Sequence, residues 1–143
     1  MEELAGTTVM IHPKLTQDPI NMQGCVGTIS NVLYEDCASY VNFGLGHFGV
    51  YNNDALLMLM PTEVALGKLP NDIDAMDLDP SEVLDIFRIS ILNESGIPEK
   101  QETALRLALA SPVISAAIVF TVQDWVDFQI ARLDQQQNPG RGR

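Results

Sequence analysis

Residues 47–59 read HFGVYNNDALLML, two short apolar runs on either side of the polar tripeptide Asn52-Asn53-Asp54. Residues 47–51 and 55–59 are too brief for helices and rich in β-forming or aliphatic side chains, so we predict two strands. Asn and Asp tolerate bent backbone, which favours a single tight helical turn between these strands.

Three further strands are predicted upstream, at residues 7–11, 25–33 and 38–43. Residues 35–36 and 44–46 are predicted to form the hairpin turns. The first connection, residues 13–24, contains Asp18-Pro19 and is expected to cross the surface as an irregular loop. Because five short strands cannot cover their apolar faces as a flat sheet, we expect them to curl into a small antiparallel barrel.

Two motifs in this region carry a family resemblance. GCVGTI at residues 24–29 resembles the glycine-punctuated second strand of KOW-type barrels. GVYNNDALL at residues 49–57 resembles the strand, one-turn helix and strand that close Src-homology-3-like barrels. The resemblance covers residues 6–60 and implies the architecture of a five-stranded Src-homology-3-like barrel.

The same region departs from the peptide-binding members of those families. It contains no Trp, and Asn52 stands where those members carry a proline, so binding of proline-rich peptides is not implied. The whole chain, with VMIHP at residues 9–13 and DALL at residues 54–57, also resembles short uncharacterised bacterial proteins such as those of the Bacteroidota, which pair such a barrel with a helical tail. That second resemblance implies no function.

After residue 60 the pattern changes to helices, so the predicted fold class is α+β. Thr62 is expected to begin a short helix to residue 66, which Gly67 and Pro70 end, and residues 71–79 are expected to form an acidic linker. Asp79-Pro80-Ser81-Glu82 predicts the start of the next helix, because it combines an Asp cap, Pro at the first helical position and a Glu three residues after the cap. The apolar stripe predicted for that helix comprises Val83, Leu84, Ile86, Phe87 and Ile91.

Three more helical segments are predicted downstream. Residues 98–110 should form a helix with an apolar side of Leu105, Ala108 and Leu109. Residues 113–120 combine an Ala-rich pattern with a β-branched end, and helix is favoured over strand. A last helix should open at residues 121–124 and direct four apolar side chains to the core: Trp125, Phe128, Ile130 and Leu133.

These segments predict a division of the chain into a barrel at residues 1–60, a short helix and acidic linker at 61–79, a three- to four-helix domain at 80–136, and a mobile tail at 137–143. The helices as a group are too apolar to stand alone in water. We therefore expect them to pack on one another, on the barrel, or on a second copy of the chain.

The charge of the chain limits its partners. The formal net charge is −11, and acids outnumber bases in both halves. Nucleic-acid binding depends on clustered Lys and Arg, so a basic or zwitterionic protein is the better-matched partner. Glu2 and Glu3 stand where a secretory signal would carry Lys or Arg, and no long apolar run follows, so a cytoplasmic location is expected.

Four residues have side chains of the types that bind zinc: His12, Cys25, Cys37 and His47. No two of them are separated by two to four residues, as structural zinc sites usually require, so no metal site is predicted. The two cysteines lie in a lysine-poor, acidic stretch that would not lower a thiol pKa, so neither is predicted to be a nucleophile.

Two other motifs fail for similar reasons. The acidic residues from Asp72 to Asp79 lack the glycine and the final glutamate of a calcium-binding EF-hand loop. GLGHFG at residues 44–49 imitates a dinucleotide fingerprint but precedes a strand instead of a helix. We therefore predict no catalytic, cofactor-binding or metal-binding residue, and no enzyme activity.

The remaining candidate is an aromatic surface of Tyr34, Tyr40, Phe48 and Tyr51, close to the loops of one half of the barrel. Aromatic rings, tyrosine above all, are favoured where an apolar surface meets water and a partner, although such rings also fill barrels. The leading hypothesis is a non-enzymatic module that binds another protein through the first loop and these turns. The alternatives are a nucleic-acid or ribosome-associated factor of the KOW type, and an enzyme subunit or assembly factor that dimerises through its helices.

Overall fold

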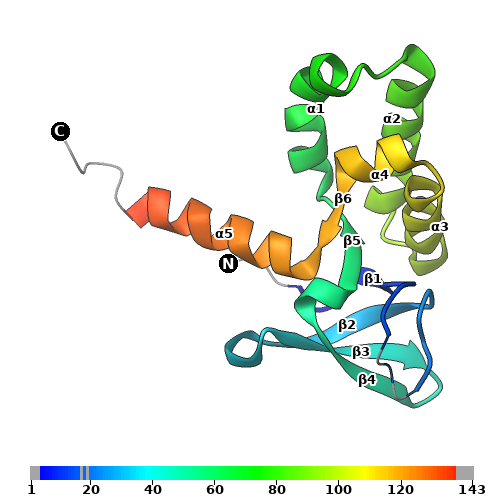
Figure 1. Cartoon of the computed structure of the whole chain (residues 1–143), viewed down its shortest axis with the longest axis vertical. Helices are drawn as coiled ribbons and strands as arrows, with labels where there is room; N and C mark the ends of the chain where they lie inside the picture. The colour runs from blue at the N-terminus through cyan, green and yellow to red at the C-terminus, as the bar shows by residue number, and fades with distance from the viewer. Residues whose placement is uncertain (1–3, 17, 19, 138–143) are drawn as a thin grey trace.

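The computed structural model describes residues 4–16, 18 and 20–137 and shows an α+β fold of a six-stranded antiparallel sheet and five α-helices (Figure 1). The strands are β1 (Thr8–Ile11), β2 (Val26–Leu33), β3 (Ala38–Gly44), β4 (His47–Asn52), β5 (Leu56–Leu59) and β6 (Val119–Thr121). Two 3₁₀ turns, η1 (Tyr34–Asp36) and η2 (Asn53–Ala55), lie between strands. The helices are α1 (Thr62–Met76), α2 (Pro80–Glu94), α3 (Pro98–Leu109), α4 (Pro112–Ile118) and α5 (Val122–Gln137).

The sheet is open, so the expected closure into a barrel is wrong. Its strand order is β4-β3-β2-β1-β5-β6, with β4 and β6 at the two edges. The free edge of β5 pairs with β6, where Leu57 lies opposite Thr121 and Leu59 opposite Val119. Val122, Trp125 and Val126 at the start of α5 then pack against the apolar face of the sheet. A strand and a helix from the second half of the chain therefore cover the strand edge and the apolar face that barrel closure was expected to cover.

The five predicted strands are all present, each within one residue of its predicted bounds. The tight turn predicted at residues 52–54 is confirmed as η2, shifted by one residue. The sixth strand was not predicted: for residues 113–120 both states were open and helix was favoured over strand, whereas α4 ends at Ile118 and the next three residues are β6. The β-branched end of this segment decides the outcome because it lies against the open edge of β5.

The expected short helix and acidic linker are also wrong. α1 continues through Gly67 and Pro70 to Met76. Pro70 removes one helical hydrogen bond, but Leu69 is buried and Lys68 both pairs with Asp72 and donates a hydrogen bond of 2.6 Å to the Ala117 carbonyl oxygen. Tertiary packing on α4 thus outweighs the local helix-breaking signals.

The N-termini of the helices agree better with the predictions from the sequence. The Asp79 side chain accepts from the Glu82 backbone N–H at 2.8 Å, and the Glu82 side chain accepts from the Asp79 backbone N–H at 2.9 Å, so the predicted capping box is confirmed. Thr121 and Asp124 cap α5 in the same reciprocal way. Of the predicted tail, Gln137 belongs to α5, and residues 138–143 lie outside the described part of the chain.

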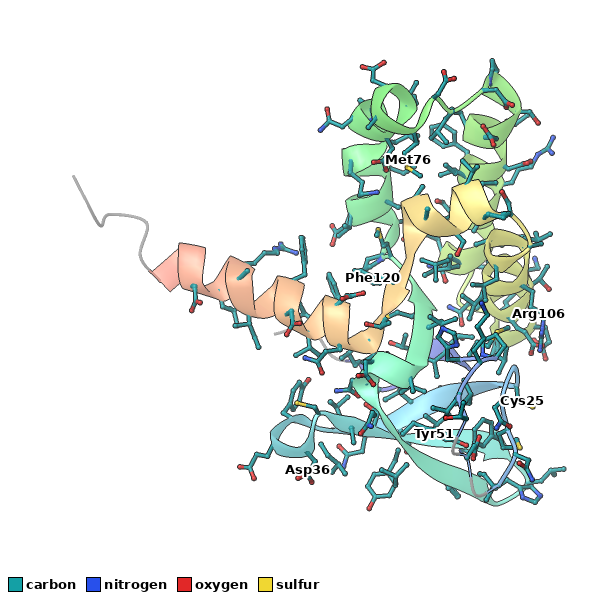
Figure 2. All side chains as sticks on the ribbon, in the orientation of Figure 1. Cys25, Asp36, Tyr51, Met76, Arg106 and Phe120 are labelled. Atoms are coloured by element: carbon teal, nitrogen blue, oxygen red, sulfur yellow. The ribbon has the colours of Figure 1, made fainter. Side chains whose placement is uncertain are left out.

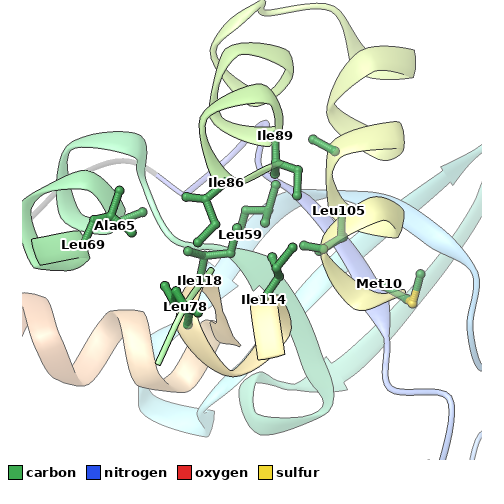
Figure 3. Packing of buried hydrophobic residues seen from close by; sticks show 13 residues of the cluster. Met10, Leu59, Ala65, Leu69, Leu78, Ile86, Ile89, Leu105, Ile114 and Ile118 are labelled. Carbon is green, nitrogen blue, oxygen red and sulfur yellow. The ribbon is translucent and has the colours of Figure 1, made fainter. Parts of the chain in front are cut away.

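Two apolar clusters fill the interior. The first joins α1–α4 to the sheet through Met10 and Leu59 (Figure 3). The second lies between the sheet and α5 and contains Trp125. Both clusters take side chains from strands and from helices, so burial of apolar surface holds the two halves together.

Gly27 in β2 provides a test of this packing. A Cβ atom added there would lie 2.6 Å from Cγ1 of Val41 and 2.9 Å from the carbonyl oxygen of Asn42 on β3. Gly27→Ala is therefore expected to lower the free energy of unfolding by about 1–3 kcal/mol, because backbone must move to admit the methyl group. Urea unfolding followed by far-UV circular dichroism measures the change.

Gly67→Ala is the matched control. An added Cβ at Gly67 meets no atom within 4 Å, and the position lies inside α1. The control should raise the free energy of unfolding by about 0.5–1 kcal/mol through helix propensity. Equal effects of the two substitutions would contradict the close approach of β2 and β3.

Candidate functional site

The structure places the four predicted aromatic residues in different surroundings. Tyr40 on β3 and Phe48 on β4 are 41% and 54% exposed. Tyr34 lies in η1 at the far end of the β2–β3 hairpin and is also exposed. Tyr51 is only 6% exposed, and its ring packs edge-on against Phe43 inside the sheet cluster. Tyr51 thus offers almost no surface to a partner.

A patch of four exposed side chains covers the β3–β4 hairpin, and we call it the hairpin patch: Tyr40, Leu45, Phe48 and Val50. Tyr40 lies directly opposite Val50, and Phe48 is two residues from Val50, so the three strand residues share the face that points away from the core. Leu45 lies in the turn of the same hairpin. Exposed apolar residues gathered on one hairpin are a better indicator of an interaction site than scattered single residues.

Leu45 and Val50 were missed from the sequence. The run HFGVY alternates, but both alternating sets are apolar or aromatic, so the pattern does not say which set faces inward. The structure turns Gly49 and Tyr51 inward, where the side chain of Ile20 from the first loop packs beside Gly49. Leu45 was assigned only to a turn, although a leucine in a two-residue turn was itself a signal.

The turn at Leu45 is unusual for its residue. Gly44 lies opposite His47, so Leu45 and Gly46 form a two-residue hairpin turn, with φ angles of 54° and 80°. Such turns prefer Asn or Asp followed by Gly, since both positions need left-handed backbone. Leu45 is 100% exposed, so neither packing nor backbone preference in the isolated chain favours leucine there.

The outer edge of β4 is open. Among the described residues, β4 pairs only with β3, and no other backbone group hydrogen-bonds to His47–Asn52. No residue of β4 is a proline or carries Lys, Arg, Asp or Glu, which are the features that commonly protect an edge strand. The hairpin patch therefore borders unpaired backbone donors and acceptors.

Asp18 fixes the first loop to β4. Its carboxylate is 8% exposed and accepts hydrogen bonds from the Tyr51 hydroxyl, at 3.1 and 3.0 Å to its two oxygens, and from the backbone N–H groups of Ile20 and Met22. The expectation that this loop merely crosses the surface is wrong at Asp18. Tyr51, labelled in Figure 2, thus supports the hairpin from the inside.

This environment alters the ionisation of Tyr51. Burial, and then the hydrogen bond to Asp18 and its negative charge, raise the pKa of Tyr51 far above its usual value of 10.0. The folded state holds the proton that the unfolded state releases near pH 10. The stabilisation linked to this proton is therefore complete below about pH 10 and is lost as the pH rises through the folded-state pKa.

We accordingly expect the free energy of unfolding to fall above pH 10 by up to about 1.4 kcal/mol per pH unit. Tyr51→Phe should remove this part of the alkaline loss, whereas Tyr40→Phe, which leaves Tyr51 in place, should keep it. Urea unfolding at several pH values between 8 and about 11.5 measures both. Identical alkaline slopes in the wild type and Tyr51→Phe would contradict the buried pair.

The residues considered for metal binding have other surroundings. Within residues 4–16, 18 and 20–137, no three His, Cys, Asp or Glu side chains lie close enough together to hold a metal ion. Nδ1 of His12 accepts from the Lys14 backbone N–H, and the thiols of Cys25 and Cys37 are unpaired. Asp72 and Asp79 are engaged with Lys68 and with the capping box of α2.

A cavity of about 280 Å³ lies between the N-terminal turn, β5, α3 and Trp125. It is lined by uncharged side chains, among them Thr8, Asn93 and Gln101, and none of its lining residues titrates near neutral pH. This cavity thus offers neither an acid nor a base for catalysis.

Comparison with known proteins adds no family. No protein-family model matches the chain, and searches of curated proteins and of solved structures give no significant match. Among the described residues, the helices are all too short or too polar to cross a membrane.

Proposed function

We propose that this chain is a cytoplasmic, non-enzymatic interaction module that binds another protein through the hairpin patch. The observation that carries the proposal is Leu45, a fully exposed leucine in a left-handed turn position. In the free protein, both the left-handed backbone and the full exposure of the side chain are unfavourable for leucine. Burial against a partner would remove the cost of exposure.

The surroundings of the patch support a partner of particular chemistry. Tyr40, Phe48 and Val50 supply rings and a branched side chain, which suit the apolar centre of an interface. Exposed Glu35 and Asp36 lie beside the far end of the same strands, since η1 leads directly into Ala38, opposite Asn52 on β4. The proposed partner therefore presents apolar side chains to the hairpin and basic ones near η1.

Leu45→Asn separates stability from binding. Asn suits the first position of this turn, so the free energy of unfolding should rise by up to about 1 kcal/mol. Thermal and urea unfolding of the purified chain measure the change. A decrease in stability would mean that Leu45 is held by contacts within the chain.

The binding test uses the same variant in the native cell. The wild type, Leu45→Asn, Phe48→Ser and a control, Leu107→Asn on α3, are cross-linked in place, and recovered proteins are quantified by mass spectrometry. Leu107 is 48% exposed and distant in sequence from the hairpin. A partner should be recovered with the wild type and the control, and its recovery should fall at least about tenfold with both hairpin variants.

Calorimetry with the purified partner then gives the affinities directly. The proposal fails if hairpin variants bind every recovered protein as the wild type does.

A further inference from the structure

The backbone at the free edge of β4 has a definite hydrogen-bonding pattern. The Asn53 backbone N–H donates to the Cys37 carbonyl oxygen at 2.8 Å, so the neighbouring pair of Ala38 and Asn52 is of the type that shares no hydrogen bonds. Bonded and non-bonded pairs alternate along an antiparallel ladder. Every second residue of β4, counted back from Asn52, therefore directs its backbone N–H away from β3.

These residues are Asn52, Val50 and Phe48, and the last two belong to the hairpin patch. Val50 and Phe48 thus offer a partner both an exposed apolar side chain and an unpaired backbone N–H and C=O. Figure 1 shows β4 as the outermost strand of the sheet. On the other face of the sheet, the exposed side chain of Ile20 lies beside Gly49. A strand added to β4 would therefore contact apolar side chains on both of its faces.

The charges at one end of this edge indicate which occupant fits. Glu35, Asp36 and Asp54 are exposed near the end of β4 at Asn52. No Lys or Arg occurs between residues 15 and 67, so a second copy of the chain would bring the same acids and no basic side chain from this region. Two copies, each with a net charge of −11, also repel each other. A segment of another protein that carries Lys or Arg has the complementary charge.

We propose that the partner of the hairpin patch binds as an extended segment that adds a seventh strand to the sheet, beside β4. The segment presents apolar or β-branched side chains to Phe48, Val50 and Ile20, and a basic residue to the acidic end. Backbone hydrogen bonds along the edge supply affinity, and the side chains supply selectivity. About five residues of the partner span the edge from residue 48 to residue 52. This inference rests on the function proposed above and adds the conformation of the partner.

Val50→Pro tests the backbone hydrogen bonds from the side of the protein. Proline removes the N–H that points outward, and an edge strand tolerates proline where that N–H faces solvent. The bonds between β4 and β3 should remain, because Val50 belongs to a non-bonded pair. Val50→Thr is the matched control, since it keeps the N–H and a β-branched side chain. Circular dichroism verifies that both variants fold.

The probe is a displayed library of random peptides of about twelve residues, selected on the wild-type chain. Selected peptides should share a run of apolar or β-branched residues with Lys or Arg at one end. Calorimetry with the best peptide should give a Kd that rises at least about tenfold with Val50→Pro and less than about threefold with Val50→Thr.

Two N-methylated forms of that peptide test the same bonds from the side of the partner. One form is methylated at the odd backbone positions and the other at the even ones. Only alternate N–H groups of a strand point to its neighbour, so one form should lose at least about tenfold in affinity and the other less than about threefold. This comparison uses the wild-type protein and is decisive even if Val50→Pro does not fold.

Amide hydrogen exchange locates the added strand. In the free chain, the amides of Phe48, Val50 and Asn52 should exchange faster than those of Gly49 and Tyr51, and saturating peptide should slow the first three. Slow exchange of these three at high protein concentration without peptide would mean that a second copy occupies the edge, and would overturn the proposal.

The outcomes separate this inference from the function on which it rests. If Leu45→Asn and Phe48→Ser abolish recovery of the cellular partner and Val50→Pro does not, the patch binds a folded surface. The added strand is then wrong, and the proposed function stands. The added strand is also wrong if the library yields no enriched peptide, or if both methylated forms bind as the parent does. Unchanged binding of every recovered protein by the two hairpin variants removes the proposed function itself.

Discussion

Trp125→Ala is expected to lower the free energy of unfolding by about 3–5 kcal/mol, which is a large share of the stability of a domain of this size. Trp125 is 2% exposed and belongs to the cluster between α5 and the sheet. Its ring lies 5.9 Å from that of Phe120 and stacks on Phe128 at 5.5 Å. Removing it leaves a void where the helix docks on the sheet.

The measurement is urea unfolding followed by far-UV circular dichroism, because the chain has no other tryptophan to report by fluorescence. Phe128→Ala is the control, since Phe128 is 39% exposed and should cost about 1 kcal/mol. If Trp125→Ala cost no more than this control, α5 would not be docked as the structure shows.

Asp18→Ala is expected to have the second-largest effect, a loss of about 3 kcal/mol. The substitution removes the acceptor for the Tyr51 hydroxyl and for two backbone N–H groups of the first loop. Buried donors without an acceptor cost more than the net value of a hydrogen bond. Asp18→Asn keeps an acceptor oxygen and should lower the free energy of unfolding by clearly less.

A double-mutant cycle assigns part of this loss to the pair itself. In the Tyr51→Phe background, Asp18→Ala should cost about 1–2 kcal/mol less than in the wild type, because the hydroxyl that needed the carboxylate is absent. Urea unfolding at pH 7 of the four proteins gives the coupling energy. Additive effects would show that Asp18 acts only on its own loop.

Local signals in the sequence predicted local structure well. The Asn52-Asn53-Asp54 tripeptide predicted a one-turn helix because its side chains favour bent backbone, and the Asp79–Glu82 pattern predicted a capping box that forms as expected. The capping box depends on neighbouring residues alone, whereas η2 also has a distant contact: buried Asn53 accepts a hydrogen bond of 2.6 Å from the Ser39 hydroxyl.

Predictions that depended on distant contacts were wrong. Gly67 and Pro70 suggested a helix end, but the buried Leu69 and the Lys68 contact with α4 keep α1 continuous. The open edge of β5 recruits β6, which replaced the expected barrel closure. The apolar residues of α2 are too many for one face, and only the packing of α3 and α1 decides that Ile86 is buried and Ile91 exposed.

The candidate site was found only in part. Tyr40 and Phe48 were correctly placed near one another on neighbouring strands, since hairpin register follows from the short turn between them. Tyr51 was assigned to the same surface because the sequence does not reveal its buried acceptor, Asp18, which lies 33 residues away. Leu45 was assigned only to a turn, and its left-handed backbone and full exposure add to the signal that a leucine in a turn already gave.

The pairing of β5 with β6 affects how the protein is made. Leu59 and Val119 are partners, yet a ribosome releases the second about sixty residues after the first, at roughly 5–20 residues per second. For several seconds the nascent sheet has an unpaired strand at each edge and lacks the indole ring of Trp125, which later packs on its apolar face. Chaperones that hold extended segments would meet the chain in this interval, and a stop codon before Val119 would leave it permanently in that state.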